Sequence, residues 1–150
     1  MGNNKYIPPL RFHWLTNTYD WLISNLMPEK IFKTKLIENA NIQENFNVLD
    51  FGTGTATLLI MAFNIQSRAK FIGIDVDEKV LNIDKKKIIK QKANVELIRY
   101  EGNILPFPDN SFDRIISSLV FHHLTTEQKL ASFFDFKIVL KPQGVIDIAE

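Results

Sequence analysis

The residues best suited to chemistry lie where a short apolar run gives way to glycines. The run from Val48 to Asp50 leads through Phe51 into Gly52-Thr53-Gly54, and a helix-like pattern follows. Two glycines permit a tight turn and a close approach of the backbone, so that a ligand can rest against the unsatisfied N–H groups at the helix N-terminus. Taken alone, the pair of glycines is also compatible with a plain strand-to-helix turn.

An acidic residue stands at a distance from this turn that suits a ribose. Asp75 ends the next apolar run and lies 23 residues beyond Gly52, close to the roughly 20-residue spacing at which an acid meets ribose hydroxyls in nucleotide-binding folds. A carboxylate only accepts hydrogen bonds, which matches the two donors of a ribose diol. Asp75 could instead cap the next helix, although Asp77 is better placed for capping. The spacing predicts a ribose-binding role for Asp75.

Two adjacent histidines follow the fourth apolar run. Histidine titrates near neutral pH, so His122 or His123 could act as a general base. The alternative is that one ring is packed and the other lies at the surface. Neighbouring side chains seldom converge on one ion and no acidic residue completes a ligand set, so the sequence predicts no metal site.

Short β-rich runs alternate with helical patterns from residue 46 onward. The helical patterns cover residues 55–66, 77–91 and 125–140, the last with a capping box at Thr125 and Gln128 and a stop at Pro142 and Gly144. Alternation of this kind predicts an α/β fold around a mostly parallel sheet. The five expected strands are Phe46–Phe51, Lys70–Asp75, Asn94–Tyr100, Phe112–Leu119 and Gly144–Glu150.

The pattern of the first 45 residues predicts a helical cap that belongs to the same domain as residues 46–150. Apolar residues from Tyr19 to Leu26 recur at helical spacing, and Pro28 ends this helix and suits the first turn of a second one. A lid over the site and an aromatic cluster in the core are both compatible with Tyr19.

Composition bounds the possible functions. The chain has 150 residues, 45% of them hydrophobic, and 18 basic against 17 acidic side chains, which predicts one globular domain with a substantial core. A net charge of +1 gives no broad attraction to nucleic acid or to an anionic membrane. The absence of cysteine excludes disulfides and thiolate metal sites. With no secretory signal pattern and no long apolar run, a cytoplasmic protein is expected.

Further segments carry motifs in a fixed order. Asp50 to Ala56 reads D-x-G-x-G-x-A, and the third glycine of a NAD fingerprint is replaced by Thr57. Glu101 to Asp113 contains L-P-F-P-D-x-S-F-D, and Leu140 to Gly144 reads L-K-P-Q-G. Together with the acid that ends the second strand, these motifs resemble the class I S-adenosylmethionine-dependent methyltransferases, in particular their ubiquinone/menaquinone-biosynthesis-like branch. The resemblance covers residues 48–150 and implies a Rossmann-like, doubly wound α/β fold.

The resemblance also implies roles for individual positions. The residues from Gly52 to Ala56, with Gly52, Thr53 and Gly54 foremost, would hold the methionine end of S-adenosylmethionine, and Asp50 would reach its ammonium directly or through water. Asp75 would take the ribose hydroxyls. The remaining positions are Val76 packed on the adenine, Asn103 and Ile104 at the adenine edge, Ser118 in the floor where donor meets acceptor, and Tyr19 in a lid near the cofactor carboxylate.

The function implied by the resemblance is methyl transfer to a small-molecule acceptor. In-line displacement needs positioning and loss of water more than a catalytic side chain. The family sheet normally has seven strands, whereas the fifth expected strand ends at Glu150. We therefore expect an exposed edge that a second copy or another chain would cover. A shortened, non-catalytic binding or assembly subunit is the alternative, and a NAD-dependent oxidoreductase is a third possibility.

Overall fold

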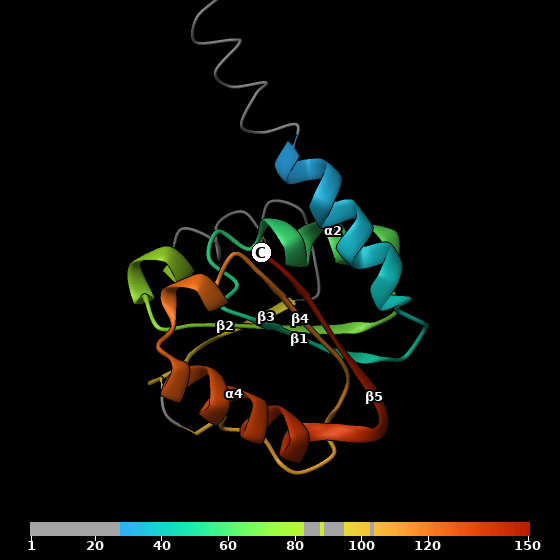
Figure 1. Cartoon of the computed structure of the whole chain (residues 1–150). Helices are drawn as coiled ribbons and strands as arrows, with labels where there is room; N and C mark the ends of the chain where they lie inside the picture. Colours follow the sequence, from blue (N-terminus) through green and yellow to red (C-terminus); the bar gives the residue numbers. More distant parts are fainter. Residues whose placement is uncertain (1–27, 83–87, 89–94, 103) are drawn as a thin grey trace, which may run out of the picture. The chain divides into compact units, whose positions relative to one another are not determined.

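The computed structural model describes residues 28–82, 88, 95–102 and 104–150 (Figure 1). The chain divides into two compact units, Met1–Ile31 and Phe32–Glu150. Of the first unit only residues 28–31 are described, and they are helical. The expected first helix with Tyr19 therefore lies outside the described residues, and the helical cap over residues 1–45 stays a prediction.

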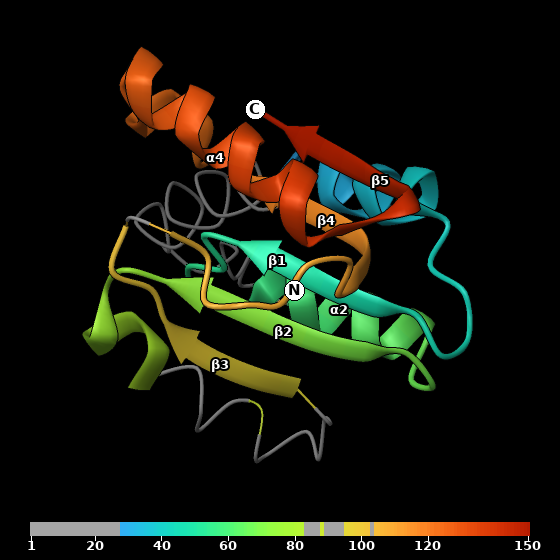
Figure 2. The ribbon, with the colours of Figure 1, turned by 90° about the horizontal axis from the view of Figure 1, so that it is seen from below.

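The second unit is built on a five-stranded parallel sheet. The strands are β1 (Asn47–Phe51), β2 (Lys70–Asp75), β3 (Val95–Arg99), β4 (Phe112–Ser118) and β5 (Leu140–Ala149). They lie in the order β3-β2-β1-β4-β5, and every neighbouring pair is parallel (Figure 2). The predicted α/β fold is confirmed. Because the strand order reverses between β1 and β4, a ligand site is expected at the carboxyl ends of these two strands.

Helices cover both faces of the sheet. Helix α2 (Thr57–Ile65) and the helical residues 32–40 lie on one face, and α4 (Thr126–Val139) lies on the other (Figures 1 and 2). The short 3-10 helix η1 (Phe121–His123) follows β4, and residues 78–82 are also helical. This arrangement is the doubly wound architecture expected from the sequence.

Two apolar cores fill the spaces between helices and sheet. The central strand β1 is buried on both faces, as expected for a parallel sheet covered by helices. Val48 packs in the core with Leu36, Ile37 and α2, whereas Leu49 packs in the core with Phe136 of α4. Alternate residues of one strand thereby anchor opposite layers.

The junction of α4 and β5 differs from the sequence prediction. Helix α4 ends at Val139 and the strand begins directly at Leu140, so Pro142 and Gly144 lie inside β5 and do not stop the helix. Backbone N–H groups of Asn110 and Ser111 donate to the last helical carbonyls, at 3.0 and 2.7 Å, which replaces a glycine cap. Proline is tolerated because β5 is an edge strand with a register shift opposite β4.

The other elements follow their predicted ranges closely. Strand β2 has the expected bounds, and β1 and β4 are each one residue shorter than expected. Strand β3 ends at Arg99, one residue earlier than expected, and the expected first residue, Asn94, lies outside the described residues. Helix α2 begins two residues later than predicted because Ala56 has a left-handed backbone, with φ of 49°. Of the expected helix over residues 77–91, the structure describes residues 77–82 and 88, which are helical except for Asp77.

The amino ends of three strands are joined by one carboxylate. Asp113 at the start of β4 accepts the N–H of Asn47 at 2.8 Å and the ammonium of Lys141 at 2.8 and 2.9 Å. Burial of Asp113 opposes ionisation, but its hydrogen bonds with Lys141 and Asn47 hold the pKa of this carboxyl below its usual range. The contact fixes β1, β4 and β5 at the end of the sheet opposite to the reversal point.

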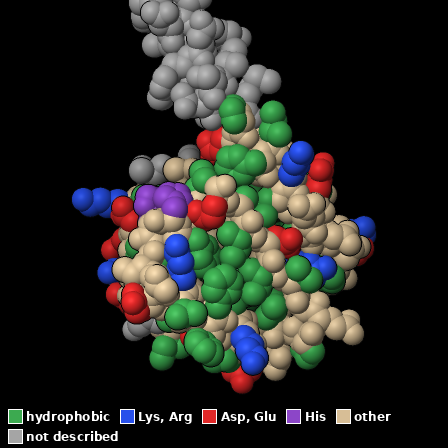
Figure 3. Space-filling view, viewed as in Figure 1, with side chains coloured by type: hydrophobic (Ala, Val, Ile, Leu, Met, Phe, Trp, Pro, Cys, Tyr) green, Lys and Arg blue, Asp and Glu red, His purple; other side chains and the backbone are tan. Residues whose placement is uncertain are grey.

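Strand β5 forms one edge of the described sheet. Hydrophobic side chains gather on the face where α4 and β5 lie (Figure 3). The exposed large hydrophobic residues of these two elements are Leu130, Phe133, Phe134, Ile138 and Val145. Val145 is the exposed hydrophobic residue of β5, whereas Ile146 and Ile148 are partly buried against the core on the α4 side. A second chain that covers this edge stays a prediction. Of the helices that the structure describes, none has the length and apolar character required to cross a bilayer.

Candidate cofactor site

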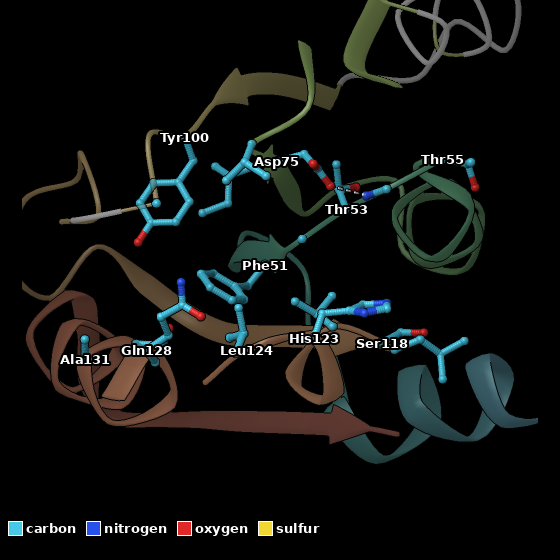
Figure 4. Close-up of a pocket in the computed structure, with 18 of the residues that line it drawn as sticks. Phe51, Thr53, Thr55, Asp75, Tyr100, Ser118, His123, Leu124, Gln128 and Ala131 are labelled. Atoms are coloured by element: carbon cyan, nitrogen blue, oxygen red, sulfur yellow. Dashed lines mark hydrogen bonds between the residues drawn. The ribbon is translucent and has the colours of Figure 1, made fainter. Parts of the chain in front are cut away.

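A cavity of about 680 Å³ lies where the strand order reverses (Figure 4). Its walls come from the carboxyl ends of β1, β2 and β4, the residues after β3, and the first turns of α4. This volume falls within the usual range for sites of small molecules and cofactors. The lining residues are Lys33, Phe51, Gly52, Thr53, Gly54, Thr55, Ile74, Asp75, Val76, Tyr100, Gly102, Ser118, Leu119, Val120, His123, Leu124, Gln128, Ala131 and Ser132.

The glycine turn after β1 needs both of its glycines. Gly52 has φ of +70° and Gly54 has φ of +53°, in the left-handed region that glycine adopts without strain. A Cβ atom at Gly52 would lie 2.5 Å from Cγ2 of Val120, whereas at Gly54 the nearest heavy atom would be 3.9 Å away. The backbone at Gly54 is therefore open to the cavity, while Gly52 accommodates the side chain of Val120.

Asp75 connects the glycine turn to the next helix. One carboxylate oxygen accepts the N–H of Gly54 at 2.9 Å, and the other accepts the N–H of Asp77 at 2.9 Å. The helix that follows is capped by Asp77, whose carboxylate accepts the N–H of Lys79 at 2.8 Å. Each oxygen of Asp75 keeps acceptor capacity, and the residue lines the cavity (Figure 4). Its position fits the predicted contact with a diol.

Asp50 lies beneath the glycine turn and is only 1% exposed. The hydroxyl of Thr53 donates to it at 2.8 Å. Burial raises the pKa of the Asp50 carboxyl to about 7, against the opposing effects of the Thr53 hydrogen bond and of the Lys33 ammonium, while the charge of Asp75 raises it further. Lys33 is itself buried and lines the cavity. A cationic and an anionic group thus stand close together at one part of the site.

The residues after β4 form the floor of the cavity. Leu119 has a left-handed backbone, with φ of 58°, and this turn leads into η1. The hydroxyl oxygen of Ser118 is buried and has no hydrogen-bond partner within the described part of the chain. Because Ser118 lines the cavity, a polar ligand atom would satisfy this hydroxyl.

The two histidines have different surroundings. His123 lines the cavity (Figure 4), whereas His122 is not among the lining residues. Nδ1 of His122 lies 2.7 Å from Oε2 of Glu150, and the two imidazole rings are 3.9 Å apart between centroids. Of the two candidates for a general base, only His123 is placed to meet a ligand. No group of three potential metal ligands occurs among the residues that the structure describes.

Most of the predicted cofactor residues come together at this cavity. Two of the remaining positions, Asn103 and Tyr19, lie outside the described residues. Ile104 is 75% exposed and does not line the cavity. Asp50 supports the turn from below. The lining residues Gly52, Thr53, Gly54, Asp75, Val76 and Ser118 were all predicted.

Sequence reasoning missed several residues of the site. Lys33 stands three residues before Leu36, on the apolar face of its helix. Lysine is rarely buried, so its occurrence at an apolar position could have indicated a site residue. Tyr100 follows β3 in a segment interpreted only as a strand end. Gln128 serves the predicted capping box and also lines the cavity.

Comparison with known proteins identifies the family. Residues 48–144 match the model of a family described as methyltransferase domain. The chain belongs to this methyltransferase family. The ubiquinone/menaquinone biosynthesis C-methyltransferase of Francisella tularensis subsp. novicida is 32% identical over 146 residues, which are 93% of this chain and 57% of that protein. The chain therefore spans little more than half the length of such curated relatives.

Solved structures agree with the family fold. A SAM-dependent methyltransferase from Aquifex aeolicus has a TM-score of 0.70 and 31% identity, and the match covers 77% of this chain and 62% of that one. The resemblance to class I S-adenosylmethionine-dependent methyltransferases and their Rossmann-like fold is confirmed. The [4+2]-cyclase SpnF has a TM-score of 0.71 at 21% identity, covering 78% of this chain and 43% of that one, which shows the fold alone. Function must therefore be argued from the site.

Proposed function

We propose that this chain binds S-adenosylmethionine and belongs to an enzyme that transfers its methyl group to a small-molecule acceptor. The observation that carries the proposal is the placement of Asp75 beside the glycine turn, at the reversal of strand order, in a cavity of about 680 Å³. Family membership and the Aquifex aeolicus structure support the choice of cofactor. A NAD-dependent oxidoreductase and a non-catalytic subunit receive no such support.

Charges near the glycine turn suit the amino-acid end of the cofactor. This end carries an ammonium and a carboxylate at neutral pH. Asp50 provides a buried anion below the turn when its carboxyl is ionised, and Lys33 provides a buried cation that lines the cavity. These two opposite charges match those of a zwitterion. A ligand group that carries only a negative charge would be repelled by the carboxylate of Asp50. We propose that Asp50 attracts the ammonium and that Lys33 binds the carboxylate.

The other part of the cavity suits adenosine. Asp75 offers two acceptor oxygens to the ribose hydroxyls. Val76 is 59% exposed although it lines the cavity, so a bound adenine would cover an apolar side chain that is otherwise in water. The hydroxyl of Ser118, which lacks a partner within the described residues, would bind a polar atom of the cofactor or of the acceptor. The site thus fits each chemical part of the cofactor.

The chemistry requires little more than positioning. S-adenosylmethionine supplies an electrophilic methyl group on a sulfonium. The residues of this chain would hold the acceptor nucleophile in line with that methyl and exclude water. His123 is the one described histidine that lines the cavity, and a nitrogen of its ring would accept the proton that the acceptor releases. The name of the Francisella relative makes a carbon nucleophile the first acceptor chemistry to test.

Titration with S-adenosylhomocysteine tests the proposed cofactor site. We expect wild-type chain to bind, and Asp75→Ala to bind at least tenfold more weakly, which is about 1.4 kcal/mol. Asp75→Asn keeps one acceptor oxygen and should lose less. Asp77→Ala is the matched control because Asp77 caps a helix and does not line the cavity.

Two results would overturn the proposal. The first is the absence of binding by wild-type chain whose fold is intact by circular dichroism. The second is an equal affinity of wild-type protein and Asp75→Ala. A cytoplasmic location and an oligomer through the edge of β5 are further expectations from the sequence and stay predictions.

A further inference from the structure

The side chain of Glu150, the residue directly after β5, accepts four hydrogen bonds from the segment after β4. Glu150 receives the N–H groups of Val120 and Phe121 on Oε1, at 3.0 and 2.8 Å. On Oε2 it receives the N–H of His122 at 3.0 Å and the ring Nδ1–H of the same residue at 2.7 Å. These contacts join residues that are 28 to 30 positions apart in the chain.

The donors are the backbone groups that η1 cannot satisfy by itself. The first N–H groups of any helix have no partner inside the helix. The N-cap residue Val120 provides no side-chain hydrogen bond to η1. The carboxylate of Glu150, the residue that follows β5, fills this role. Hydrogen bonds to an ionised acceptor are stronger than those to a neutral one.

The segment held in this way forms part of the cofactor cavity. Val120 lines the cavity and packs its Cγ2 atom against the backbone of Gly52, where a Cβ would lie 2.5 Å away. The ring of His122 contacts that of His123 at a tilt of 47°, with 3.9 Å between the centroids, and His123 also lines the cavity. Glu150 itself is not a lining residue. Its influence on a ligand would pass through Val120 and His123.

The ionisation of Glu150 is consistent with this arrangement. Burial raises the pKa of its carboxyl, but the hydrogen bonds from the His122 ring and from three backbone amides together bring this pKa below its usual range. The carboxylate therefore stays charged at neutral pH and keeps both oxygens available as acceptors.

We propose that Glu150 is a positioning residue, whose carboxylate fixes residues 120–123 so that Val120 and His123 shape the cofactor cavity. The part of this inference that concerns ligand affinity depends on the proposed binding of S-adenosylmethionine. The part that concerns the order of residues 120–122 does not depend on it. The two parts can be measured separately.

The test combines backbone exchange with ligand affinity. Amide hydrogen exchange by NMR should accelerate at least tenfold at Val120, Phe121 and His122 in Glu150→Ala, with the amides of β1 unchanged. The dissociation constant for S-adenosylhomocysteine should rise about tenfold, and Glu150→Gln should recover part of this loss because one oxygen remains. Glu96→Gln is the matched control, because Glu96 is an exposed carboxylate on β3, at the other edge of the sheet.

A further variant separates the ring contact from the backbone contacts. His122→Ala removes the Nδ1 donor and keeps the three backbone donors, so exchange at Val120 and Phe121 should change less than threefold. If Glu150→Ala only lowers the unfolding temperature and leaves both local exchange and affinity unchanged, Glu150 is not a positioning residue. If wild-type protein does not bind S-adenosylhomocysteine, the proposed function fails, and the exchange pattern alone decides whether Glu150 holds the segment.

Discussion

The buried carboxyl of Asp50 predicts a cofactor affinity that changes with pH near neutrality. Burial raises the pKa of this carboxyl from 3.8 to about 7. We expect the cofactor ammonium to bind the ionised form, so the apparent dissociation constant equals the intrinsic one divided by the ionised fraction. With this pKa, the ionised fraction is about nine-tenths at pH 8 and about one-tenth at pH 6. The affinity should therefore fall about tenfold, or about 1.4 kcal/mol, between pH 8 and pH 6.

The assay is calorimetric titration of S-adenosylhomocysteine at both pH values, with two controls. Methylthioadenosine lacks the amino-acid end, so its affinity should not change with the ionisation of Asp50. Asp50→Asn removes the titrating carboxyl and retains His123, which lines the same cavity. We expect this variant to bind weakly and with similar affinity at the two pH values.

Unliganded protein should show the opposite preference. Because the folded-state pKa of Asp50 lies above its unfolded value, folding favours the protonated form, and the stability of wild-type protein should decrease as pH rises from about 4 to about 7. In the limit, the shift from 3.8 to about 7 corresponds to about 4 kcal/mol. Asp50→Asn should therefore unfold at a higher temperature than wild type at pH 8. A wild-type affinity that is equal at pH 6 and pH 8, or an unchanged pH dependence in Asp50→Asn, would refute this reasoning.

Three further substitutions are best compared by urea unfolding at pH 7 and by titration with S-adenosylhomocysteine. Gly52→Ala combines a φ of +70° with a contact of 2.5 Å to Val120, so we expect a loss of about 1–3 kcal/mol in unfolding free energy and a weaker affinity. Asp113→Asn removes the charged acceptor shared by Asn47 and Lys141 and should lower the unfolding free energy by about 1–3 kcal/mol. The affinity should not change, because Asp113 lies at the amino ends of the strands, away from the cavity. Thr125→Ala removes half of a capping box and should cost about 1 kcal/mol.

Each of these expectations has a clear contrary result. Wild-type stability and affinity in Gly52→Ala would show that the turn tolerates a side chain and that Val120 moves aside freely. A change of cofactor affinity in Asp113→Asn would show that the two ends of the sheet are coupled. Unchanged stability in Thr125→Ala would mean that water replaces the cap without cost.

The sequence predicted the sheet well because parallel strands leave a clear pattern. Largely apolar runs such as Val48–Phe51, in which Asp50 is the one polar residue, are typical of strands buried on both faces. The glycine turn follows this run directly, and Asp75 follows the next one. The junction at Leu140 was missed because Pro142 and Gly144 are general signals for the end of a helix. Only the donors from Asn110 and Ser111, which are distant in sequence, make that signal unnecessary here.

The site residues that belong to local sequence motifs could be predicted, whereas those that reach the site from distant parts of the chain could not. Gly52, Gly54 and Asp75 belong to recognisable patterns. Glu150 acts on η1 from 28 to 30 residues away, and no spacing rule in a single sequence connects the two. Lys33 reaches the cavity from a helix that precedes the sheet, so its role depends on tertiary packing.

Because α4 continues directly into β5 without a loop, residues cannot be inserted at this junction without displacing one of the two elements. Helix α4 lines the cavity with Gln128, Ala131 and Ser132 and ends at Val139, with Leu140 already paired to Phe112. One residue inserted in α4 would turn its first half by about 100° about the helix axis. One residue inserted early in β5 would exchange the faces to which its side chains point. Insertions should therefore be excluded from the α4–β5 junction in functional relatives.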